Sequence, residues 1–177
     1  MNLPNNPTYS SGRTVKARNL QYLSRPADEE ILAYCRNSQP AFILTSPHMG
    51  KSSIIARTAE RLKKEKTYHP VIIDLSQFPL PPRQEEWFQK ILFLLENHLD
   101  LSEDSIDWLD RHSSLPFPER LTTFLEEVVL AEIHGSLVLL FDEIEQTLSC
   151  PFRGELFSWL SSLYEARSTH PIFQRIS

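Results

Sequence analysis

The chain has few cysteines and no long apolar run. Cys35 and Cys150 are its only cysteines and lie far apart in the sequence, which argues against a disulfide framework or a paired-cysteine metal site. No segment reaches the roughly 18 apolar residues of a membrane span, and the N-terminus has neither the basic nor the apolar region of a secretion signal. We therefore expect a cytoplasmic protein that does not enter a membrane.

Positive charge is also in deficit, with 18 Lys and Arg against 23 Asp and Glu and a net charge of −5. A protein that binds nucleic acid needs a basic face, so we expect no nucleic-acid partner. The basic cluster at 61–66 closes a predicted helix, where cations complement the negative end of the helix dipole. The length of 177 residues and the 41% hydrophobic content favour one globular domain.

Glycine is scarce, and one of the four glycines lies in the most informative segment. An apolar run at 41–44 breaks into a loop that ends in Gly-Lys-Ser-Ser. The glycine lets the backbone approach an anion, the lysine reaches the outer phosphates, and the hydroxyl can ligate magnesium. The predicted phosphate-binding residues are His48, Met49, Gly50, Lys51, Ser52 and Ser53.

The loop departs from the pattern G-x-x-x-x-G-K-[ST], because Thr45 occupies the first glycine position. A β-branched residue is strained at positive φ, so Thr45 should hold an ordinary extended or helical conformation. Pro47 has no N–H to donate, which leaves the amides of 48–53 to form the cradle. We expect a slightly remodelled loop with reduced or altered nucleotide affinity.

A second motif supports the first. Residues 137–141 have the pattern of a buried strand, and the strand closes on Asp142 and Glu143. An acid in this position binds magnesium in ATPases with a phosphate-binding loop. Acids at strand ends are more commonly plain surface residues, but the two motifs in this order together predict a site for ATP and Mg²⁺, with Ser52 and Asp142 as metal ligands.

The remaining pattern alternates helices with strands. Residues 1–20 are predicted to form a flexible arm, and 21–177 the folded domain. A helix should begin near Pro26, and strands are expected at 41–44, at 71–75 after the bounding Pro70, and at 137–142. The apolar residues from Leu121 to Ile133 recur at helical spacing and should form core. Such alternation predicts an α/β fold with a mainly parallel sheet.

These segments resemble the AAA-like domain family of bacterial, especially cyanobacterial, proteins, which is grouped with signal-transduction NTPases. The matching stretches are 22–29, 48–53, 71–75, 124–133 and 138–144. The resemblance implies a P-loop NTPase with three α/β/α layers, in which Lys51 holds the β- and γ-phosphates and Glu143 activates water. It also suggests Arg25 as an accessory nucleotide contact, with a surface helix-capping arginine as the alternative.

The resemblance also implies a sensor strand and a helical lid after the last residue, Ser177. We therefore expect a truncated domain that needs a missing C-terminal half, protein partners or an oligomer. The leading function is an ATP-binding signalling module whose Mg-dependent hydrolysis belongs to the complete domain. A catalytically inactive interaction module is the alternative, while a DNA-processing ATPase or a small-molecule kinase fits the composition and motifs less well.

Overall fold

A computed structural model describes residues 25–44 and 49–177 of the chain. It has an α/β fold, in which two strands are interspersed among helices. The longer elements are α1 (Pro26–Arg36), α2 (Lys51–Lys64), β1 (Tyr68–Asp74), α3 (Gln84–Leu99), α4 (Ser105–Arg111), α5 (Phe117–Phe124), α6 (Leu130–Glu132), β2 (Ser136–Asp142) and α7 (Arg153–Ala166). Short 3-10 helices cover Leu75–Gln77, Ile144–Ser149 and Pro171–Arg175. None of the described helices has the length and apolar character needed to cross a membrane.

The sheet consists of β1 and β2, which pair in parallel over their whole length, from Tyr68 with Ser136 to Asp74 with Asp142. The predicted parallel arrangement is therefore confirmed. The expectation that Pro70 precedes the first of these strands is wrong, because Pro70 lies inside β1 opposite Val138. A proline fits there since, among the described residues, β1 pairs with β2 on one side and has no strand on the other, and an edge strand can lack one N–H.

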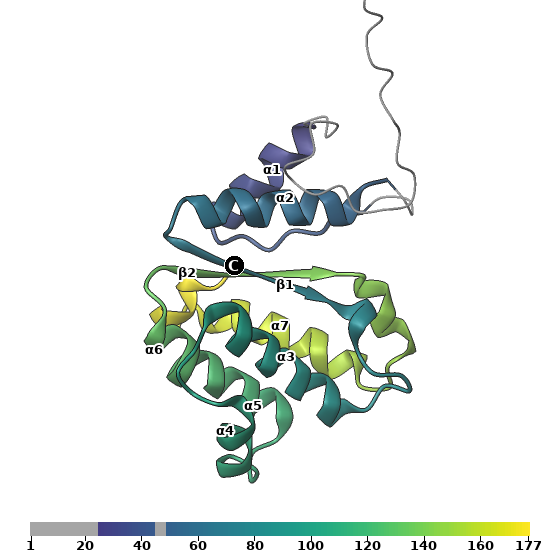
Figure 1. The fold of residues 1–177 in the computed structure, drawn as a ribbon, viewed down its shortest axis with the longest axis vertical. Helices are drawn as coiled ribbons and strands as arrows, with labels where there is room; N and C mark the ends of the chain where they lie inside the picture. The colour runs from purple at the N-terminus through teal and green to yellow at the C-terminus, as the bar shows by residue number, and fades with distance from the viewer. Residues whose placement is uncertain (1–24, 45–48) are drawn as a thin grey trace, which may run out of the picture.

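Helices cover both faces of the sheet (Figure 1). On one face, α1 and α2 enclose a small apolar cluster of Leu32, Cys35, Leu62 and Val138. On the other face, α3, α5 and α7 pack over the larger core, which includes Val71 and Ile73 of β1 and Leu137 of β2. Neighbouring residues along each strand thus face opposite cores, as the pleat requires.

The larger apolar residues at 121–133 are buried on a helical stretch, as predicted. The helix is not α-helical throughout. A π-helical turn over Leu125–Val129 joins α5 to α6. Leu121, Phe124, Leu125 and Val129 on this stretch are fully buried. The indole N–H of Trp159 on α7 donates to the Thr122 hydroxyl at 3.0 Å, which ties α7 to α5.

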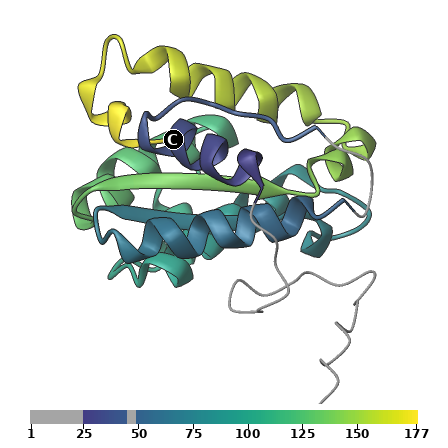
Figure 2. The same ribbon diagram turned by 90° about the horizontal axis from the view of Figure 1, so that it is seen from above.

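The predicted strand at 41–44 is not formed. These residues are irregular, and the side chains of Phe42 and Leu44 are 77% and 92% exposed. An apolar run becomes a strand only where a neighbouring strand accepts its backbone hydrogen bonds. The segment between α1 and Phe42 runs beside the sheet without joining it (Figure 2). It is held by a hydrogen bond from the Arg167 guanidinium to the Ser38 carbonyl.

The outer edge of β2 pairs with the last two residues of the chain. The Ser177 N–H donates to Leu137 O at 2.9 Å, and the Leu139 N–H donates to Ser177 O at 2.8 Å. Arg175 anchors this segment, because its guanidinium donates to three carbonyls at the end of α6. These belong to Leu130, Ile133 and Gly135, at 2.7, 2.6 and 2.8 Å.

Gly135 lets the chain turn tightly from α6 into β2. Its φ is +114°, and a Cβ at this position would lie 2.2 Å from Thr67 O, which already accepts the Ser136 N–H. Gly135→Ala should therefore lower the free energy of unfolding by about 2–4 kcal/mol, through backbone strain and the clash. Denaturant titration followed by circular dichroism measures this loss.

Gly154→Ala is the matched control, because a Cβ there meets nothing within 4 Å and Gly154 lies in the helix α7. That substitution should leave stability unchanged or raise it by up to about 1 kcal/mol. Equal effects of the two substitutions would contradict the tight turn.

Candidate functional site

The N-terminus of α2 carries the predicted phosphate-binding residues that the structure describes. Gly50 precedes the helix with φ of +85°, a left-handed conformation that favours glycine. Lys51, Ser52 and Ser53 follow as the first helical turn. Because N–H groups in a first turn have no acceptors within their own helix, and the helix dipole is positive here, this end is suited to an anion.

The carboxylates after β2 lie against Lys51. The Lys51 ammonium donates to both carboxylate oxygens of Glu145, at 2.9 and 3.0 Å, and lies 3.9 Å from a carboxylate oxygen of Glu143. The Lys51 side chain is 23% exposed and that of Glu145 is 50% exposed. The fold therefore brings the start of α2 and the end of β2 to one edge of the sheet, the edge at which parallel strands place ligands.

Charge and burial shift the pKa values of these groups in different directions. Burial raises the pKa of Glu143, and the charges of Glu145 and Asp142 raise it further against the opposing charge of Lys51. A hydrogen bond from its own backbone N–H, followed by the one from Lys51, lowers the pKa of Glu145. Burial works to lower the pKa of Lys51, but the hydrogen bond to Glu145 and the charge of Glu143 outweigh it and raise that pKa.

Asp142 is the last residue of β2 and is buried, with 7% of its surface exposed. One of its carboxylate oxygens accepts the Glu143 N–H at 2.9 Å. Mg²⁺ in nucleotide sites typically takes one or two carboxylates and completes its shell with phosphates and water. Asp142 is a carboxylate at the end of β2, on the same edge of the sheet as the start of α2. The described residues contain no group of three or more His, Cys, Asp or Glu side chains that would form a closed metal cage.

Arg25 reaches the phosphate-binding segment from the start of α1. Its guanidinium donates to Met49 O at 2.6 Å and lies beside Gly50, where an added Cβ would be 3.4 Å from its Nη2 atom. The Arg25 backbone N–H donates to the buried Asp28 carboxylate at 2.7 Å, and the Asp28 N–H donates back to Arg25 O at 3.0 Å. These two hydrogen bonds hold the backbone of Arg25 at the start of α1, and so position its guanidinium.

The structure thus brings most of the predicted residues to one edge of the sheet. Lys51 and Glu143 lie close together, and Arg25 contacts the loop at Met49 and Gly50. His48, like Thr45 and Pro47, lies outside the described residues. Glu145 has no role predicted from its sequence context, yet it makes the shortest contact with Lys51. Its position two residues after Glu143 is the signal that could have identified it.

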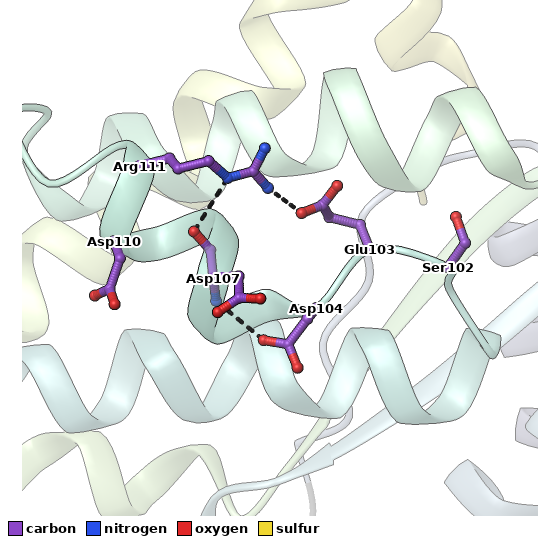
Figure 3. A pocket seen from close by; sticks show the side chains of 6 residues that line it. All are labelled: Ser102, Glu103, Asp104, Asp107, Asp110 and Arg111. Carbon is purple, nitrogen blue, oxygen red and sulfur yellow. Dashed lines mark hydrogen bonds and ion pairs between the residues drawn. The ribbon is translucent and has the colours of Figure 1, made fainter.

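A separate hollow of about 560 Å³ surrounds the start of α4 (Figure 3). Two of its four acidic side chains already serve the local structure. Asp104 accepts the N–H groups of Ile106 and Asp107 at 2.9 and 3.0 Å, and Glu103 pairs with Arg111. The hollow is lined by Ser102, Glu103, Asp104, Asp107, Asp110 and Arg111. It contains none of the residues around Lys51.

Comparison with known proteins identifies the family of the chain. The chain belongs to the AAA-like domain family, whose match covers residues 10–177. This family implies a nucleotide-binding module. The chain is also 28% identical over 181 residues to an uncharacterized WD repeat-containing protein of Synechocystis sp.. That match covers 100% of this chain but 15% of the relative's length. No solved structure matches the chain significantly.

The Asp28 cap should contribute measurably to stability. Asp28→Ala removes the carboxylate that holds the start of α1, so we expect the free energy of unfolding to fall by about 1–2 kcal/mol. Glu30→Ala is the control, since Glu30 is an exposed acid on the same helix and such a surface change typically stays within about 0.5 kcal/mol. Chemical denaturation of both variants tests this, and a loss no larger for Asp28→Ala would contradict the role of the cap.

Proposed function

We propose that the chain binds ATP with Mg²⁺ at the edge formed by α2 and the end of β2, as the nucleotide module of a cytoplasmic signalling ATPase with the P-loop fold. The observation that carries this proposal is the position of Lys51. Its ammonium lies at the start of a helix and within 3.9 Å of the acidic residues that follow β2. A cation and helix N–H groups can bind the phosphates of a nucleoside triphosphate, and a buried carboxylate can bind its metal ion.

Each residue has a proposed part. Lys51 binds the β- and γ-phosphates, while the first turn of α2 supplies N–H donors to them. Ser52 and Asp142 hold Mg²⁺, which offsets the negative charge of the phosphates. Glu143 orients the attacking water and accepts its proton, a role that suits the raised pKa of this carboxyl group. Arg25, held above Gly50, is an accessory contact to the nucleotide.

The alternative is an interaction module that has lost turnover. Phe42 and Leu44 favour it, because both side chains are largely exposed close to the loop and exposed apolar groups are typical of contact surfaces. The relative's WD repeats are consistent with partner proteins in either case. The chain spans only 15% of that relative, so signalling, hydrolysis and assembly are proposals for the larger protein.

Isothermal titration calorimetry with ATP and Mg²⁺ tests the binding proposal. Lys51→Ala should weaken ATP binding about 10–100-fold, because it removes a charge-assisted hydrogen bond to the phosphates. Lys63→Ala is the matched control, since Lys63 is an exposed lysine at the far end of the same helix. This variant should bind ATP with the affinity of the unchanged chain. No binding by the unchanged chain would overturn the proposal and favour the interaction module.

Asp142→Asn separates metal from nucleotide binding. Because it removes the carboxylate charge proposed for Mg²⁺, the gain in ATP affinity that Mg²⁺ confers should fall at least several-fold. The measurement compares ATP titrations with Mg²⁺ and with a chelator, for the unchanged chain and for the variant. An equal Mg²⁺ effect in both would remove Asp142 from the metal site.

A further inference from the structure

The Lys51 ammonium is already held by a carboxylate that the proposed mechanism does not use. Both oxygens of Glu145 accept from it, at 2.9 and 3.0 Å, whereas the nearest Glu143 oxygen is 3.9 Å away. Glu145 belongs to the 3-10 helix after β2, so the contact joins two segments far apart in the sequence. The Lys51 ammonium, which is predicted to bind phosphate, is therefore already paired with the Glu145 carboxylate.

Backbone geometry explains how Glu145 reaches Lys51. Glu143 has φ of +55°, a left-handed conformation that is uncommon for any residue other than glycine. It turns the chain sharply from β2 into the 3-10 helix, and the Gln146 N–H closes this turn by donating to Glu143 O at 2.9 Å. The Asp142 carboxylate accepts the Glu143 N–H at the same place. The turn is thus tied to the residue proposed for Mg²⁺.

Phosphate and Glu145 compete for the Lys51 ammonium. An ammonium has three N–H donors, and the two oxygens of Glu145 already accept from it. Phosphates at the start of α2 would also bring like charge close to a carboxylate that is held in its ionised form. Because the Glu145 side chain is half exposed, it can swing into solvent without disturbing the core.

From this competition we infer that Glu145 is a latch, which occupies Lys51 in the nucleotide-free protein and is displaced when the outer phosphates of ATP bind. This inference rests on the proposed ATP site and adds a regulatory residue to it. The latch lowers the apparent affinity for ATP, since its ion pair must break first. It also links nucleotide occupancy to the position of the 3-10 helix after β2.

Glu145→Asp is the decisive variant, because it keeps the negative charge but shortens the side chain by one methylene group. Glu145→Gln removes the charge, and Glu127→Gln removes an equal charge from an exposed site on the π-helical turn. Calorimetric titration with ATP and Mg²⁺ should show about 2–5-fold tighter binding for both Glu145 variants, as expected for release of a partly exposed ion pair. Glu127→Gln should bind like the unchanged chain.

Three outcomes would overturn the latch. If Glu145→Asp binds like the unchanged chain and only Glu145→Gln binds more tightly, the effect is one of overall charge. If both variants bind more weakly, Glu145 belongs to the binding site. If both bind like the unchanged chain, the ion pair has no influence on affinity. Absence of ATP binding by every protein, the unchanged chain included, would instead refute the proposed function on which the latch rests.

Lysine acylation provides a readout without nucleotide. An amine in an ion pair stays protonated and reacts slowly, so Lys51 should react with acetic anhydride faster in Glu145→Asp than in the unchanged chain. Mass spectrometry measures this rate, with the exposed Lys63 as an internal reference. Equal Lys51 rates in the two proteins would show that Glu145 does not hold the ammonium in solution.

Discussion

The parallel pairing of β1 with β2 is the constraint on which the other features depend. Its register sets Asp74 opposite Asp142, so both strands end at the same level. Parallel strands cannot be joined by a tight hairpin, and the chain between them must form a crossover. Helices α3 to α6 are that crossover, and they supply much of the larger core. The same register carries Asp142 and the acids after it to the start of α2.

The fold could be predicted wherever local pattern and packing agree. The apolar spacing from Leu121 to Val129 identifies a buried helix, and the proline at Pro26 with the following acids identifies the start of α1. The segment at 41–44 was predicted wrongly because a strand depends on a partner that its own residues do not specify. In this structure the edge of β2 near Leu137 pairs with Ile176 and Ser177.

The candidate site could be predicted in its residue types but not in its contacts. The Gly-Lys-Ser sequence and the acids after an apolar run identify Lys51 and Asp142, because each motif is local. The contact between Lys51 and Glu145 depends on the left-handed turn at Glu143. A glutamate gives no sequence signal for that conformation. The pairing of charges therefore becomes visible only in three dimensions.

The π-helical turn at 125–129 is a place where the length of the chain can change. A π-helical turn accommodates one residue more than an α-helical turn, so deleting one residue there would leave a continuous α-helix. Because the wide turn absorbs that residue, the helix on either side would keep its orientation. Gly135 would still face Thr67, and Arg175 would keep the carbonyls at the end of α6. The same deletion inside the regular helix α3 would rotate every later residue of that helix by about 100° about its axis.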